Sequence, residues 1–73
     1  MSSDAIGPLG VRKGDRIRLI SSTDRQPPPP GSTGTVIGWN TDPRFAQVWI
    51  RWDPGVPSNL NLIPNEDRWE VIP

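Results

Sequence analysis

The chain has 73 residues, and its eight basic and eight acidic side chains give a formal net charge of zero. This length holds one domain with a thin core, and the charge balance weighs against a protein held on DNA or an anionic membrane by bulk electrostatics. The absence of Cys and His excludes disulfides and removes the side chains that transition metals prefer. We therefore expect the four Trp and ten Pro to provide the aromatic packing and chain stiffness that a small domain needs.

Residues 1–10 are polar and small, with Gly7, Pro8 and Gly10, and we predict a flexible N-terminal lead-in at residues 1–12. Residues 13–73 then form the folded domain. The beginning of the chain has no basic region followed by an apolar run, and no stretch approaches the length of a membrane span. We expect a cytoplasmic protein.

Residues 14–20 alternate between polar and aliphatic side chains, which predicts a half-buried strand. Ile17 and Leu19 should face the core, and Arg16 and Arg18 the solvent. Residues 21–32 follow as a stiff loop, because the four consecutive prolines at 27–30, here named the proline segment, remove backbone donors and favour an extended conformation.

The second strand is expected at residues 33–39, where Gly34 and Gly38 indicate a bend or a bulge. After a turn at 40–44, the third strand should run from 45 to 52 with Val48, Ile50 and Trp52 pointing inward. A turn at 53–56 contains Pro and Gly in the positions that a type II turn favours.

The end of the chain completes the pattern with a fourth strand at 58–63, one helical turn at 64–67 and a fifth strand at 69–72. No segment has apolar residues at helical spacing for several turns. Five short strands separated by turns predict an all-β fold, a small five-stranded barrel, since closure removes exposed sheet edges.

Several short runs together carry a family resemblance. They are Gly-Asp-Arg-Ile-Arg-Leu at 14–19, Gly-Thr-Val at 34–36, Val-Trp-Ile-Arg-Trp-Asp at 48–53 and Leu-Asn-Leu-Ile-Pro at 60–64. Over residues 13–72 the chain resembles the DUF4314 family of small domains from bacteria, phages and mobile elements, although its turn at 53–57 is longer than the usual Asp-x-Gly. It is also similar to SH3-like barrels of the KOW type.

The resemblance implies an SH3-like barrel and brings no activity with it. The setting of the family in mobile elements implies an accessory or structural protein of a phage or plasmid, and association with a virion fits that setting.

Catalysis is not expected from these residues. The chain has no His, Cys or Tyr and a single lysine, Lys13, so the usual general bases and nucleophiles are missing. We can suggest one cluster of carboxylates, formed by Asp53, Glu66 and Asp67. Glu66 and Asp67 fit better as groups that cap backbone donors in a turn. We predict no catalytic residue, no metal site and no small-molecule cofactor.

An exposed aromatic stripe is the candidate binding surface. If the third strand faces inward at Val48, its Trp49 and Arg51 face outward, and the turn at 40–44 would place Trp39 opposite Phe45 and Ile37 opposite Gln47. A contiguous apolar patch of this kind marks an interaction surface. The alternative is that the proline segment folds back and covers Trp39 or Trp49 as a second small core. Trp52 and Trp69 are assigned to the core or its rim. The predicted partner-binding residues are Ile37, Trp39, Phe45, Trp49, Arg51, Arg16 and Arg18.

Three kinds of partner fit this surface. The first is a protein, or a second copy of this chain, because Trp and Arg are enriched at the energetic centres of interfaces. The second is a nucleic acid whose bases stack on Trp39 or Trp49 while arginines, including Arg44, meet the phosphates. In the third, the proline segment is itself the ligand of another domain. We expect a protein partner first and a nucleic acid second, and no membrane.

Overall fold

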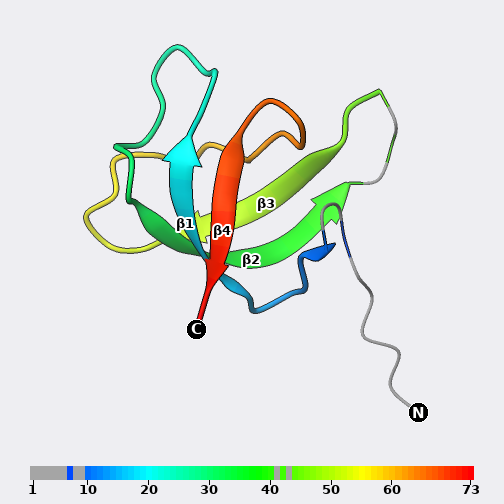
Figure 1. Cartoon of the computed structure of the whole chain (residues 1–73), viewed down its shortest axis with the longest axis horizontal. Coiled ribbons are helices and arrows are strands. Elements are labelled where there is room, and N and C mark those ends of the chain that lie inside the picture. Colours follow the sequence, from blue (N-terminus) through cyan, green and yellow to red (C-terminus); the bar gives the residue numbers. More distant parts are fainter. Residues whose placement is uncertain (1–6, 8–9, 41, 43) are drawn as a thin grey trace.

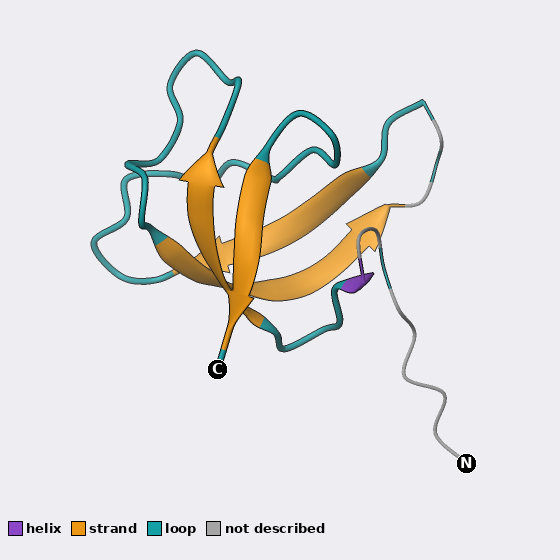
Figure 2. Cartoon of the chain, viewed as in Figure 1, coloured by secondary structure: helices purple, strands orange, loops and turns teal. Residues whose placement is uncertain are grey.

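The computed structural model describes residue 7 and residues 10–40, 42 and 44–73. These residues form one four-stranded antiparallel sheet (Figures 1 and 2). Its strands are β1 (Arg16–Ser21), β2 (Thr33–Asn40), β3 (Gln47–Trp52) and β4 (Arg68–Ile72), in the spatial order β3-β2-β1-β4. The all-β prediction is therefore confirmed. Most of the predicted lead-in (residues 1–6 and 8–9) and two residues of the predicted 40–44 turn (Thr41 and Pro43) lie outside the described residues.

The predicted five-stranded barrel is wrong, because residues 58–63 contribute a single β-bridge instead of a strand. Val48 and Leu62 exchange two backbone hydrogen bonds, of 2.7 and 2.9 Å. The backbone groups of Leu60 bond to side chains instead: its amide donates to Ser58 Oγ, and its carbonyl accepts from Trp52 Nε1. Two prolines, Pro57 and Pro64, flank the segment and lack the N–H that a ladder needs. Within the described residues β3 and β4 are the two edges of an open sheet.

The strand patterns read from the sequence place the core correctly. Ile17 and Leu19 of β1 are buried, as are Val48, Ile50 and Trp52 of β3. Several strand ends differ from expectation: β1 covers Arg16–Ser21, β2 ends at Asn40, β3 begins only at Gln47 and β4 begins at Arg68. Trp69 is half-buried against the core, together with Trp39 and Val56. The complete buried cluster consists of Val11, Ile17, Leu19, Val36, Val48, Ile50, Trp52 and Leu62.

Val11 is the core residue that the sequence pattern missed. It precedes the predicted domain start at residue 13 and is fully buried. Its carbonyl accepts a 2.7 Å hydrogen bond from the amide of Gly7. The chain before β1 is therefore part of the packed unit from Val11 onward.

Hydrogen bonds stabilise two turns, one after β3 and one before β4. The turn at 53–56 forms as predicted: the Val56 amide donates to the Asp53 carbonyl, and Gly55 has φ +92°, which a residue with a side chain rarely adopts. The second turn centres on Asp67, which is only 5% exposed. Its carboxylate accepts hydrogen bonds from Ser22 Oγ (2.7 Å) and from the Ile63 amide (2.8 Å). Asp67 thereby joins the loop after β1 to the turn before β4.

The pairing of β2 with β3 contains the bulge that the glycines indicate. Val36 lies opposite Ile50 and Gly38 lies opposite Trp49, so Ile37 is the extra residue. The predicted register is wrong: Trp39 lies opposite Val48 instead of Phe45, and Gln47 lies opposite Asn40 instead of Ile37. Since paired residues of an antiparallel ladder share a face, the bulge turns Trp39 toward the core side, where Val48 is buried.

Candidate binding site

An apolar groove of about 310 Å³ crosses β2 at the bulge. We name it the tryptophan groove; it is lined by Lys13, Ile37, Gly38, Trp39 and Trp49. The chain before β1 reaches this place because the Gly14 amide donates to the Val36 carbonyl at 2.8 Å, and the Val36 amide donates to the Asp15 carbonyl at 2.9 Å. Lys13 is thus held beside the bulge, and its exposed side chain adds a cation to an otherwise apolar groove.

Gly38 explains how Trp49 is positioned. A Cβ placed on Gly38 would lie 2.8 Å from Cε3 of Trp49, so the indole lies directly over the glycine backbone. This contact holds one part of the ring, yet Trp49 remains 41% exposed and its neighbour Ile37 45% exposed. The aromatic surface is therefore both fixed in place and open to a partner.

Gly7 packs closely against the indole of Trp39. A Cβ placed on Gly7 would lie 2.5 Å from Cδ2 of Trp39, which leaves room only for glycine there. The proline segment leads into Thr33 at the beginning of β2, whereas Trp39 lies near its end (Figure 1). Gly7, which the sequence assigned to a flexible lead-in, is thus a close neighbour of this indole at the end of β2 away from the prolines.

The remaining members of the predicted stripe lie outside the groove. Arg51 is exposed and lies opposite Thr35, one outward position along β3 from Trp49. Phe45 is 64% exposed and lines a separate hollow next to Ile63 and Pro64. The guanidinium of Arg44 lies 5.8 Å from the centre of the Phe45 ring, a cation–π contact. The structure thus gathers Ile37, Trp39 and Trp49 in one place and leaves Phe45 apart.

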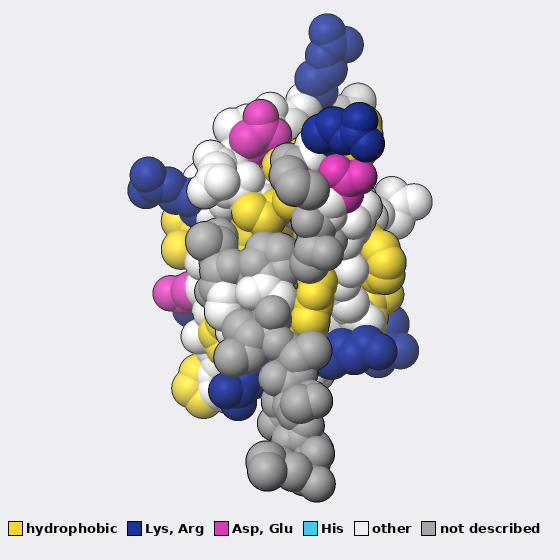
Figure 3. Space-filling model, turned by 90° about the vertical axis from the view of Figure 1, so that its right-hand side faces the viewer, with side chains coloured by type: hydrophobic (Ala, Val, Ile, Leu, Met, Phe, Trp, Pro, Cys, Tyr) yellow, Lys and Arg dark blue, Asp and Glu magenta, His cyan; other side chains and the backbone are white. Residues whose placement is uncertain are grey.

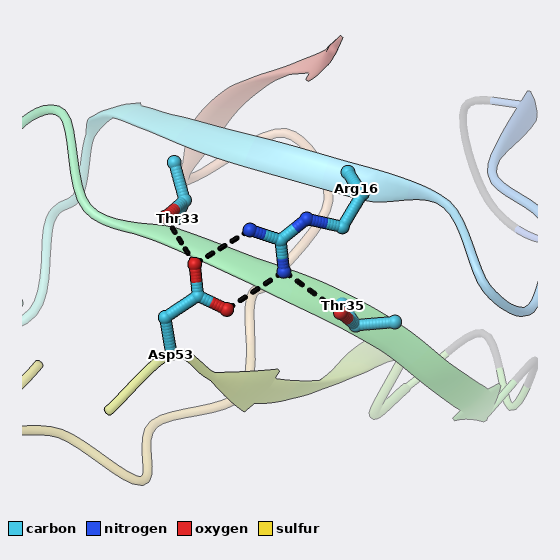
Figure 4. A network of polar contacts seen from close by, with 4 residues as sticks. All are labelled: Arg16, Thr33, Thr35 and Asp53. Atoms are coloured by element: carbon cyan, nitrogen blue, oxygen red, sulfur yellow. Dashed lines mark hydrogen bonds and ion pairs between the residues drawn. The ribbon is translucent and has the colours of Figure 1, made fainter. Parts of the chain in front are cut away.

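Arg16 is committed to an ion pair within the fold. Its two terminal nitrogens donate to the two carboxylate oxygens of Asp53, at 2.7 and 2.5 Å, and one of them also donates to Thr35 Oγ1 at 2.9 Å (Figure 4). Thr33 donates to the same carboxylate. The hydrogen bonds from Arg16 and Thr33 hold the pKa of Asp53 well below the usual carboxyl range, and the bond to Asp53 raises the pKa of Arg16.

Arg18 is likewise paired, because it faces Glu70 across the β1–β4 ladder and donates to its carboxylate at 2.9 Å. Both partners of this pair are about half exposed. The two arginines of β1 that the sequence assigned to a partner therefore each have a carboxylate partner inside the chain.

A larger hollow of about 560 Å³ lies along β4 and is lined in part by polar side chains, Asn65, Asp67 and Arg68. Its apolar members include Ile20 and Val71, which are exposed. Figure 3 shows one face of the molecule, on which separate hydrophobic areas lie between Lys and Arg side chains. Among the described residues, no three acidic side chains come together in a way that could hold a metal ion.

A family comparison matches residues 10–72 to the model described as a domain of unknown function, DUF4314. The chain belongs to the DUF4314 family. No curated protein and no solved structure matches it, so the relation to SH3-like barrels stays a prediction. The DUF4314 model begins at residue 10, one residue before the buried Val11. In the part of this DUF4314 chain that the structure describes, no helix has the length and apolar character that crossing a bilayer requires.

Lys13 and Gly38 are the groove residues that sequence reasoning did not assign to the site. A usable signal existed for Gly38, since a glycine inside a strand and next to an aromatic residue indicates a bulge or a close approach. Lys13 gave no such signal, because its place depends on backbone hydrogen bonds between the chain before β1 and Val36.

Proposed function

We propose that this chain is a non-catalytic module that binds a protein partner through the tryptophan groove. The observation that carries the proposal is Trp49, an indole held over Gly38 and still exposed beside Ile37. Tryptophan contributes large contact areas at little entropic cost, and it is enriched among the residues that dominate binding energy. Lys13 and Arg51 provide charged contacts around the apolar centre, the arrangement typical of interfaces.

The charges of the chain favour a protein over a nucleic acid. A strand of nucleic acid needs cations free to meet its phosphates. Arg16 and Arg18 are paired with Asp53 and Glu70, and Arg44 lies 3.6 Å from Asp42. Phosphate contacts of Arg16, Arg18 or Arg44 would have to replace these internal pairs, which leaves Lys13 and Arg51 as the exposed cations next to the groove.

Peptide display provides the positive test. Random peptides are selected on the wild-type chain alone, and the selected peptides are then titrated against wild type and each variant. We expect the selected peptides to bind wild type and the Phe45→Ala control equally, and the Trp49→Ala variant at least tenfold more weakly, which corresponds to about 1.4 kcal/mol. Peptides that bind wild type, Phe45→Ala and Trp49→Ala with equal affinity would refute the groove as the binding site.

Oligonucleotide titration provides the competing test. Single-stranded and duplex oligonucleotides of mixed sequence are added at low salt while Trp fluorescence is followed. We expect no saturable change. Saturable quenching that weakens steeply with salt, and is lost in Arg51→Glu, would establish nucleic-acid binding instead.

A further inference from the structure

The proline segment offers a ligand that suits the tryptophan groove. Pro27, Pro29 and Pro30 are exposed, whereas Pro28 is buried. Consecutive prolines adopt the polyproline II conformation, which presents its rings at three residues per turn and about 3.1 Å rise per residue. Grooves lined by aromatic side chains bind such segments, and the indoles of Trp39 and Trp49 both line the tryptophan groove.

The proline segment is fixed before any partner arrives. The Gly31 amide donates to the Leu19 carbonyl at 2.8 Å, and Ser32 donates to the Pro29 carbonyl through its amide (3.0 Å) and its hydroxyl (2.6 Å). Asp24 accepts from the Gln26 amide at 2.9 Å, which orders the residues just before the prolines. Such preorganisation lowers the entropic cost of binding.

Within one molecule these two features cannot meet. The proline segment ends before Thr33, and the groove centres on Gly38, so about five residues of β2 separate them, roughly 16 Å at 3.3 Å per residue. In Figure 1 the loop from β1 to β2, which carries the proline segment, lies at the left of the molecule, and the arrowhead of β2 lies at the right. A contact between them therefore joins two copies.

The charges beside the two features allow one ion pair across the contact. Lys13 lines the groove, and the exposed Asp24 stands before the proline segment, followed by the exposed Arg25, so the segment itself carries one charge of each sign. The net charge of zero also means that two copies do not repel each other over a distance.

We propose that the proline segment of one copy docks in the tryptophan groove of the next, so that the chain associates head to tail. This inference rests on the proposed function, and it makes a second copy of the chain the occupant of the groove. The contact is heterologous, since different surfaces of the two copies meet, and repetition of it produces rings or open filaments.

Sedimentation of two complementary variants tests the proposal. Trp49→Ala removes the groove and retains the prolines, whereas Pro29→Ser with Pro30→Ser retains the groove and removes two exposed rings. Across about 10 μM to about 1 mM, a range suited to the weak binding of small interfaces, we expect the average mass of wild type to rise at least twofold. Each variant alone should stay monomeric. Their mixture should form a one-to-one dimer, and the Phe45→Ala control should associate like wild type.

Two results would overturn head-to-tail association. One is a wild-type chain that stays monomeric at about 1 mM, a concentration at which even weak interfaces are populated. The other is association that both variants retain, which would place the contact elsewhere.

A peptide of residues 23–31 separates this failure from failure of the proposed function. It is titrated against the Pro29→Ser, Pro30→Ser variant while Trp fluorescence is followed. If wild type stays monomeric and the peptide binds with loss of affinity in Trp49→Ala, self-docking is refuted and the groove remains a protein-binding site. If neither this peptide nor any displayed peptide binds, both proposals are refuted.

Discussion

Gly34 is expected to be a position where a single added methyl group destabilises the sheet. It lies opposite Trp52 in the β2–β3 ladder. A Cβ placed there would be 2.7 Å from Cγ2 of the buried Ile50 and 2.9 Å from the carbonyl oxygen of Arg51. Both distances are shorter than van der Waals contact, and one of the two neighbours is backbone, which can move only if the strands separate.

The size of the effect follows from two opposing contributions. Overpacking of a core typically costs about 1–3 kcal/mol, and replacing Gly by Ala returns about 0.4–1 kcal/mol by restricting the unfolded chain. We expect Gly34→Ala to lower the free energy of unfolding by about 1–2 kcal/mol, or Tm by about 4–16 °C for a domain of this size. Thermal unfolding followed by circular dichroism measures the change.

Gly38→Ala is the matched control on the same strand. Its added Cβ would meet the Trp49 ring alone, at 2.8 Å, and this exposed ring can move aside. We expect a smaller loss of Tm than for Gly34→Ala, together with a shift in Trp fluorescence. A Tm for Gly34→Ala at or above that of wild type, or a larger loss in Gly38→Ala, would refute the packing argument.

Two polar contacts give further predictions. Since the pKa of Asp53 is held low, its carboxylate stabilises the fold above about pH 4, and this contribution is lost as the pH falls toward the folded-state pKa. The Tm difference between wild type and Asp53→Asn should therefore shrink between about pH 5 and about pH 2 in thermal melts, and a constant difference would contradict the ion pair with Arg16. Asp67→Ala leaves the donors of Ser22 and Ile63 without their acceptor and should cost about 1–3 kcal/mol in urea unfolding. Asp67→Asn, which keeps one acceptor oxygen, should cost less, and equal losses would contradict the hydrogen-bonding role.

The sequence predicts the part of the fold that depends on the alternation of polar and apolar side chains along a strand. Ile17 and Leu19, or Val48 and Ile50, are buried because successive side chains of a strand point to opposite faces, and that rule needs no knowledge of the neighbouring strand. The same rule correctly leaves Arg16 on the solvent face. It says nothing of Asp53, which meets Arg16 across β2 and is 37 positions away along the chain.

The predicted fifth strand failed for a different reason. Leu60 and Leu62 alternate as strand residues do, but hydrogen bonding decides whether a segment joins a sheet. The backbone of Leu60 bonds to Ser58 Oγ and Trp52 Nε1, and these side-chain partners cannot be read from a pattern of hydrophobicity. Val11 escaped notice because a single apolar residue between glycine and charged residues has no periodicity to reveal it.

The candidate site was predicted only in part because one extra residue in β2 reverses the face of the sheet to which the following side chains point. Val36 and Ile37 are both apolar, so the sequence permits either of them to face the core, and the pattern cannot show that one of them is extra. A regular ladder would place Trp39 on the same face as Ile37. With Ile37 as the extra residue, Gly38 lies under Trp49 and Trp39 lies on the core side.

Deletion of Ile37 tests this account directly. If Ile37 is the extra residue, its removal leaves Gly38 opposite Trp49 and Trp39 opposite Val48, as they are now. The deletion should then change Tm by less than about 4–8 °C, which corresponds to about 1 kcal/mol, and Trp39 should keep its environment in ¹⁹F NMR of fluorotryptophan-labelled protein. In a regular ladder, the same deletion would turn residues 38–40 to the opposite face. Exposure of Trp39 with a large loss of stability would therefore refute the bulge, and with it the geometry of the tryptophan groove.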